Sequence, residues 1–227
     1  FIRSLNSAEF FFPMSLWFPG EGVDALRSYE TDIGMEYWLG SSYTLMLTGF
    51  YKNEQNVTEF NEEGWTTGDY FKAGDGNVIG LELFCRKKVG RIRGYLAYTL
   101  LKAEREFDGE KYAASFDRTH NLCLVLSYDW GRWFNLGLNW RFGSGIPYTP
   151  FEGVENSLRL PYYSRADITL RTQFALLGFK LSPYLIFINL GKRKNPTHYD
   201  SETGEYTHLS LPFFPFIGFK GELTRNK

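Results

Sequence analysis

Apolar and polar residues alternate with a period of two along several stretches of this chain. In the clearest one, residues 134–142, Phe, Leu and Trp at even positions alternate with Asn, Gly and Arg at odd positions. Successive side chains of a β-strand point to opposite faces, so this pattern predicts a strand with one apolar and one polar face. Strands are expected at nine places: about 28–38, 43–53, 78–88, 91–105, 118–130, 133–143, 164–176, 180–191 and 214–224. A further segment, 8–18, contains Pro13 and is expected to be either loop or a tenth strand.

Short and long connections alternate between these segments. The short ones lie at 40–41, 89–90, 131–132 and 177–179, and the long ones at 53–77, 106–118, 143–163 and 191–211. Bacterial outer-membrane barrels have short periplasmic turns and long extracellular loops. Segments of about 10–15 residues also suit a tilted membrane crossing better than an ordinary strand of about 5–6. The pattern predicts an all-β, antiparallel, up-and-down transmembrane β-barrel portion of about nine or ten strands.

Composition narrows the class of protein without changing this fold. Aromatic residues make up 19% of the chain, and Tyr and Trp gather near the short turns, as in the interfacial girdle of a membrane barrel. No apolar run approaches the roughly 20 residues of a membrane helix. The formal net charge of -1 gives no global field that would attract a nucleic acid.

The uniform composition, the cysteines, the histidines and the N-terminus add four further expectations. Residues 1–227 show no composition break and are expected to form one domain. Cys85 is in phase with the apolar residues of its strand and Cys123 with the polar ones, so two free thiols on opposite faces are expected. The three histidines lack metal-ligand spacing, and neither a metal nor a cofactor is expected. The first residues do not resemble a signal peptide, so the chain is expected to be a mature or truncated piece.

Two groups of residues are candidates for contact with a ligand. One consists of polar-face strand residues, expected to line a lumen or to pair within the wall: Arg93, Asn139, Arg141, Arg165, Asp167 and Arg171. The other consists of aromatic residues in the long connections, expected to contact ligand from extracellular loops or to pack those loops: Trp65, Tyr70, Phe71, Tyr148, Phe151, Tyr199 and Tyr206. No catalytic constellation accompanies them, since the nucleophile-elbow and dinucleotide-loop spacings are both missing.

Several ordered segments resemble the C-terminal barrel region of TonB-dependent outer-membrane receptors. They are similar most of all to the Bacteroidota-type group that carries a carboxypeptidase-regulatory-like domain before the plug. The resembling segments are Gly80–Leu83 with the Lys-rich hairpin 86–90, Tyr95–Leu100, Phe116–His120, Trp140–Thr149, Asn156–Asp167, Ile188–Leu190 with Lys194–Pro196, and Leu211–Pro215. The chain departs from the family pattern at Ser164, where His is usual, and it lacks the usual terminal aromatic residue.

The resemblance implies a function and a set of partners. It implies the barrel part of a receptor for TonB-dependent nutrient uptake in the bacterial outer membrane, which is not an enzyme. The ligand would bind extracellular loops and a polar lumen, and could be a small molecule, a glycan or a peptide. The implied partners are membrane lipid, an N-terminal plug, the remaining strands of a 22-strand barrel and, through the plug, the inner-membrane TonB complex.

Two alternatives stay open at the level of sequence. One is a small self-contained outer-membrane barrel of about ten strands, acting as a porin, an adhesin or a membrane enzyme. It requires residues 1–18 to pair with 214–224. The other is a soluble carbohydrate-binding β-protein, whose apolar strand faces would form a core and whose aromatic loops would bind sugar.

Overall fold

A computed structural model describes residues 24–60, 70–131, 133–150, 154–200, 203–208 and 211–223. All regular structure in these residues is β-strand, and none of their segments is a helix long and apolar enough to cross a membrane. The strands are β1 (Arg27–Leu39), β2 (Tyr43–Phe60), β3 (Phe71–Lys87), β4 (Ile92–Phe107), β5 (Glu110–Ala113), β6 (His120–Trp130), β7 (Phe134–Gly143), β8 (Pro147–Tyr148), β9 (Leu158–Arg159), β10 (Tyr163–Thr172), β11 (Phe174–Leu176), β12 (Phe179–Ile188), β13 (His198–Asp200), β14 (Glu205–Thr207) and β15 (Phe214–Leu223).

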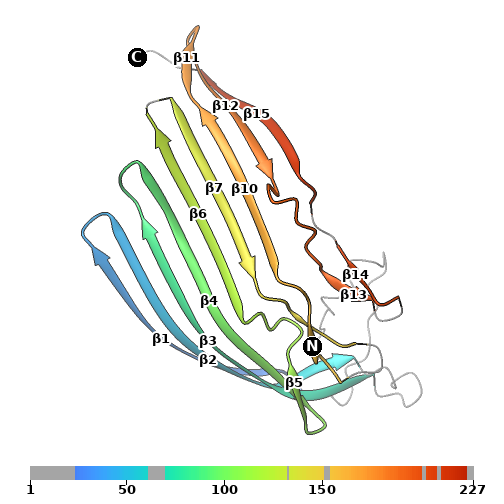
Figure 1. The fold of residues 1–227 in the computed structure, drawn as a ribbon. Coiled ribbons are helices and arrows are strands. Elements are labelled where there is room, and N and C mark those ends of the chain that lie inside the picture. Colours follow the sequence, from blue (N-terminus) through green and yellow to red (C-terminus); the bar gives the residue numbers. More distant parts are fainter. Residues whose placement is uncertain are drawn as a thin grey trace.

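One antiparallel sheet contains eleven of these strands. Its order is β1-β2-β3-β4-β6-β7-β10-β12-β11, with β5 paired to β4 and β15 paired to β12. β10 and β11 both pair with β12 and form a single crossing. Setting aside the short strands β5, β8, β9, β13 and β14, nine long crossings remain, as the alternation predicts. Figure 1 shows them as one curved sheet whose two edges are β1 and β15.

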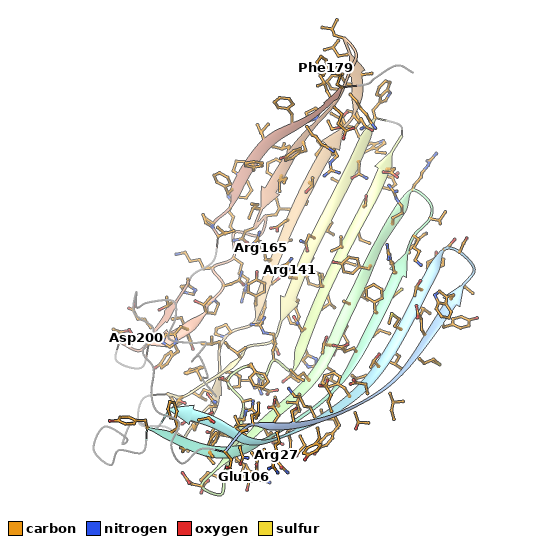
Figure 2. The ribbon with its side chains drawn as sticks, turned by 180° about the vertical axis from the view of Figure 1, so that it is seen from behind. Arg27, Glu106, Arg141, Arg165, Phe179 and Asp200 are labelled. Atoms are coloured by element: carbon orange, nitrogen blue, oxygen red, sulfur yellow. The ribbon has the colours of Figure 1, made fainter. Side chains whose placement is uncertain are left out.

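The two ends of the sheet differ, as the alternation of short and long connections predicts. Tight hairpins join the strands at one end, and the long connections, with β5 and the β13–β14 hairpin, gather at the other (Figure 1). Figure 2 places Phe179 at the short-turn end, and Arg27, Glu106 and Asp200 at the opposite end. Glycines at the four turns, Gly40, Gly90, Gly131 and Gly178, have φ values of 58°, 100°, 64° and 78°. L-residues with side chains rarely adopt this left-handed region, so glycine suits these turns.

The expected long loop over 53–77 is wrong at both ends. β2 continues to residue 60 and β3 begins at residue 71, so most of this stretch is paired strand. A bulge between Glu54 and Val57, with Asn56 at φ 58°, shifts the register. A bulge breaks the period-two pattern, which is why the alternation stops near residue 53. On β3, Gly76 allows the side chain of Arg105 to lie close to the β3 backbone, because a Cβ at Gly76 would lie 1.8 Å from Nη1 of Arg105.

The apolar face of the sheet is bare. Ile33, Ile217 and Phe219 are 77%, 78% and 76% exposed. Apolar side chains on the same face of the other long strands are also exposed. The accessible surface is 16756 Å² for a chain of 26.4 kDa. A compact monomer of that mass exposes roughly 10,600 Å². No second layer covers this face in the described part of the chain (Figure 1), so the described strands do not by themselves form the sandwich that the soluble alternative requires.

A small core lies instead on the polar face, near the end with long connections. It consists of Val78, Ala103 and Ala114, with Phe50 and Leu101 packed against it.

The cysteines behave as expected. Both are free, and the register pairs Cys85 with Leu96 but Cys123 with Ala97, which places the two thiols on opposite faces.

Candidate functional site

The strand residues expected to face a lumen share one face of the sheet. Residues directly opposite in an antiparallel pair project to the same side. The register sets Arg141 opposite Arg165, and Asn139 opposite Asp167. Arg171 is in phase with the two β10 residues. Figure 2 shows Arg141 and Arg165 on neighbouring strands in the middle of the sheet.

Asp167 joins this polar face to the end of β12. Arg165 makes a two-pronged contact with it, from Nε to Oδ1 at 2.9 Å and from Nη2 to Oδ2 at 2.8 Å. The backbone N–H of Asn189 donates to the same Oδ1 at 2.8 Å. The Asn189 amide then donates to the carbonyls of Arg193 and Leu211 at 3.0 and 2.9 Å. Asp167 therefore holds the long connection after β12 in place.

The other polar-face residues differ in how well they are paired. Arg93 forms an ion pair with Asp129 at 2.5 Å. The side-chain oxygen of Asn139 is buried and accepts no hydrogen bond from the described residues. Arg141 and Arg171 are exposed, and no ion pair within the described ranges includes either one. These two guanidinium groups give the face positive charge that is available to an anionic partner.

A break in the strand ladder beside β4 is filled by a buried carboxylate. β4 pairs with β5 and then with β6, and between them residues 115–118 make no backbone hydrogen bond to β4. Asp117, 2% exposed, reaches into the break, and its Oδ1 accepts the backbone N–H of Ala103 at 2.9 Å. Arg159 pairs with its Oδ2 and also donates to its backbone carbonyl at 2.8 Å. The carboxylate thus replaces a missing backbone acceptor, which would otherwise leave a buried N–H unpaired.

The same contacts hold the 143–163 connection against the break. Arg159 donates to the carbonyl of Gly145 at 3.1 Å, and the amide of Asn156 donates to the carbonyl of Ala113 at 2.8 Å. Asp117 and Arg159 are absent from the residues that the sequence singles out as sites. Their signal is present, however, because each lies in a different segment that resembles the receptor family, and the structure brings the two segments together.

A second buried amide fixes the connection between β12 and β13. Asn195 is 1% exposed; its Oδ1 accepts the N–H of Ser164 at 2.9 Å, and its Nδ2 donates to the carbonyl of Ser164 at 3.1 Å. The side chain therefore pairs with the start of β10 as a neighbouring strand would. Long connections at this end are tied down by side chains and are not free coils.

Three of the predicted loop aromatics form one cluster, which we call the tyrosine triad: Tyr148, Tyr199 and Tyr206. Ring centroids are 4.5 Å apart for Tyr148 and Tyr199, 5.5 Å for Tyr199 and Tyr206, and 6.4 Å for Tyr148 and Tyr206. They come from β8 and from the β13–β14 hairpin, so the triad joins two long connections. The hydrogen bond with the Tyr206 hydroxyl, together with burial, raises the pKa of Tyr148 to about 12.

The remaining predicted aromatics do not act as loop residues in the same way. Phe71 is the first residue of β3 and lies opposite Phe60, and Tyr70 directly precedes it. These two mark the end of a strand pair and not the middle of a loop, because β2 and β3 extend beyond the expected bounds. Trp65 and Phe151 lie outside the described residues. No cluster of three or more metal-binding side chains occurs in the part of the chain that the structure covers.

Several solved structures share this architecture, and three of them are described here. The ferric-catecholate import receptor Fiu from E. coli K12, in its closed form, matches with a TM-score of 0.66 and 16% identity, over 88% of this chain and 28% of the receptor. The ferric citrate transporter FecA, in its unliganded form, matches with a TM-score of 0.65 and 19% identity, over 86% of this chain and 31% of the transporter. The ferripyoverdine receptor of the Pseudomonas aeruginosa outer membrane, bound to ferripyoverdine, matches with a TM-score of 0.63 and 19% identity, over 86% of this chain and 26% of the receptor.

At these identities the likeness shows a fold, that of part of an outer-membrane barrel. The chain spans less than a third of the length of each of these proteins. No protein-family model matches the sequence, and neither does any curated protein.

Proposed function

We propose that this chain supplies the C-terminal part of the barrel of a TonB-dependent outer-membrane receptor for nutrient uptake. The observation that carries the proposal is the bare apolar face of the sheet. So large an exposed apolar surface is energetically unfavourable in water, whereas contact with lipid carries no such cost. Antiparallel strands with short turns at one end and long connections at the other are the form that bacterial membrane barrels take.

Each face of the wall then has a separate role. The apolar face contacts lipid, and the polar face, with Arg141 and Arg171 unpaired by carboxylates, lines the lumen and meets the plug or the passing ligand. The tyrosine triad lies among the extracellular connections, where aromatic side chains could stack against a ligand. No bond chemistry is required of these residues, and the proposal makes the chain a receptor and not an enzyme.

The edges of the sheet support a role as part of a larger barrel. β1 and β15 lie at opposite edges and do not pair with each other. Every backbone N–H and C=O in a bilayer must be paired, so a spanning sheet has to close. We propose that further strands of a longer protein close it, and that the plug of the same protein mediates contact with the inner-membrane TonB complex. The resembling segments favour the Bacteroidota-type group.

The open sheet bears differently on the two alternatives. A self-contained ten-strand barrel would need residues 1–18 to supply the tenth strand and to pair with 214–224, and residues 1–18 lie outside the described residues. A soluble sugar-binding protein would need cover for the apolar face, which the described strands lack.

Cell fractionation tests the proposal. The full-length protein that contains this chain should sediment with the outer membrane, require detergent for extraction and migrate differently on gels with and without boiling. Recovery from the soluble periplasmic fraction as a folded monomer would refute it.

In a bacterium that carries the gene, deleting it should abolish energy-dependent uptake of one member of a panel of iron chelates, cobalamin, oligosaccharides and peptides. Unchanged uptake of the whole panel would contradict the transport role.

A further inference from the structure

Two consecutive cations lie over aromatic rings at the end of the sheet that carries the long connections. The Arg193 guanidinium lies 3.8 Å from the ring centroid of Tyr162, and its Nη2 donates to the carbonyl of Tyr162 at 3.0 Å. The Lys192 ammonium lies 5.5 Å from the ring centroid of Phe213. Lys192 is exposed and Arg193 is half-buried, in a connection that two buried amide side chains hold in place. We call these four residues the cation–ring site.

Both rings of this site belong to the apolar face of the sheet. The ring centroid of Tyr162 lies 5.7 Å from that of Phe142, and Phe213 stacks on Phe187 with centroids 6.2 Å apart. The register of β7, β10 and β12 assigns Phe142 and Phe187 to the apolar face. Tyr162 and Phe213 are 49% and 37% exposed. The cation–ring site is therefore accessible from the side that contacts lipid in the proposed function.

The level of the site coincides with the limit of the apolar face. Ser144 and Tyr162 each lie one residue beyond the last pair of β7 and β10, and the N–H of Ser144 donates to the carbonyl of His120 at 2.8 Å. These three residues form one row across the wall. Beside them, the Tyr98 hydroxyl lies 2.8 Å from Nδ1 of His120. Rings that carry polar atoms at the edge of a lipid-facing surface occupy the headgroup level of a membrane, where lipid phosphates lie.

The two cations are not neutralised by carboxylates of this chain. No ion pair among the residues that the structure describes includes Lys192 or Arg193. Arg86 and Arg91, at the short-turn end, are unpaired too, but the phase of their strands directs them to the polar face. The cation–ring site thus combines unpaired positive charge with rings on the lipid side of the wall.

We infer that the cation–ring site binds a phosphate of an anionic lipid in the outer leaflet of the outer membrane, with the acyl chains of that lipid against the apolar face. The inference rests on the proposed function, which directs the long connections outward. Cations beside a membrane-spanning surface attract anionic headgroups. Two adjacent cations offer several N–H donors to one phosphate, and the rings beneath them hold these donors in place.

Lipid binding by the full-length protein that contains this chain tests the inference. The protein is purified in neutral detergent, and native mass spectrometry measures its affinity for lipid A with its phosphates and for lipid A without them. The wild type should bind the phosphorylated form at least roughly tenfold more tightly, since each surface cation contributes about a fivefold factor. K192Q/R193Q should lose most of this preference. Excess inorganic phosphate should not displace the lipid, and displacement would assign the site to a soluble anion and overturn the inference.

Matched variants separate this site from a general effect of charge. R86Q/R91Q removes two unpaired cations from the polar face at the opposite end and should bind phosphorylated lipid A like the wild type. The charge-conserving K192R/R193K should also bind like the wild type. Should K192Q/R193Q fail to fold, Lys192→Gln alone, at an exposed position, should weaken binding by about fivefold.

The possible failures of the inference and of the proposed function are distinct. Equal affinity of the wild type for the two forms of lipid A, or equal loss in K192Q/R193Q and R86Q/R91Q, overturns the inference and leaves the receptor role intact. A full-length protein that is soluble without detergent refutes the proposed function instead, before any lipid is added.

Discussion

Single polar side chains complete the hydrogen bonding of this sheet where its strands are interrupted. Asp117, Asn189 and Asn195 are each at most 2% exposed, and each pairs with backbone groups of a neighbouring segment. Period-two alternation assigns faces to strand residues but gives no information about residues between strands. For that reason the sequence predicted the polar-face arginines and could not predict that Asp117 and Arg159 meet.

Removing the Asp117 carboxylate should destabilise the wall. Asp117→Ala leaves the buried N–H of Ala103 without its acceptor and Arg159 without its partner, and we expect a loss of about 2–4 kcal/mol in the free energy of unfolding. Asp129→Ala, which breaks the exposed pair with Arg93, serves as the control and should cost less than about 1 kcal/mol. Denaturant unfolding in detergent measures both; equal losses would contradict a special role for Asp117.

The tyrosine triad makes a prediction about pH. The raised pKa of Tyr148, about 12, means that folding favours its neutral hydroxyl. The contribution of this contact to stability is therefore complete below the ordinary tyrosine value of about 10 and is lost as the pH rises through 12. Absorbance at 295 nm, compared between the wild type and Tyr148→Phe, should isolate this late titration. Tyr206→Phe should return the pKa of Tyr148 toward 10. A Tyr148 hydroxyl that titrates near 10 in the wild type would refute the hydrogen bond.

At the scale of elements, the sequence predicted the nine crossings and failed mainly at one strand pair. Periodicity located each long strand because one face is uniformly apolar. It stopped early in β2 and began late in β3 because a bulge at Asn56 shifts the phase and because Gly74 and Gly76 resemble a turn. The short strands within the long connections were missed for another reason: two to four residues are too few to show a period.

The connection between β7 and β10 depends on one glycine. A Cβ at Gly145 would lie 1.6 Å from the carbonyl oxygen of Leu160, which is backbone and cannot move aside alone. We expect Gly145→Ala to displace residues 158–160, to weaken the Arg159–Asp117 pair and to cost about 1–3 kcal/mol. Limited proteolysis should then cut within 143–163 faster than in the wild type. Gly49→Ala, where nothing lies within 4 Å, should leave the cleavage rate unchanged, and equal rates in both variants would contradict the tight approach.

At the scale of the whole molecule, the sheet is one wall with two different faces and two open edges. Alternation and loop lengths predicted this wall and the gathering of its short turns at one end. The identity of the ligand did not follow, because barrels of one fold serve many ligands and their specificity lies in particular side chains. The number of strands that would close the proposed barrel did not follow either, since edge strands have the same alternation as central ones.

The two native cysteines provide the most direct test of the account, because Cys85 lies on the apolar face and Cys123 on the polar one. Cys85→Ser and Cys123→Ser each leave one of these two thiols, and both variants can be made in the full-length protein, with any other cysteine replaced by serine, and inserted into lipid vesicles. A charged, membrane-impermeant thiol reagent should label the variant that keeps Cys123, and a lipid-soluble maleimide should label the one that keeps Cys85. Equal labelling of both by the charged reagent would contradict a lipid-facing apolar wall.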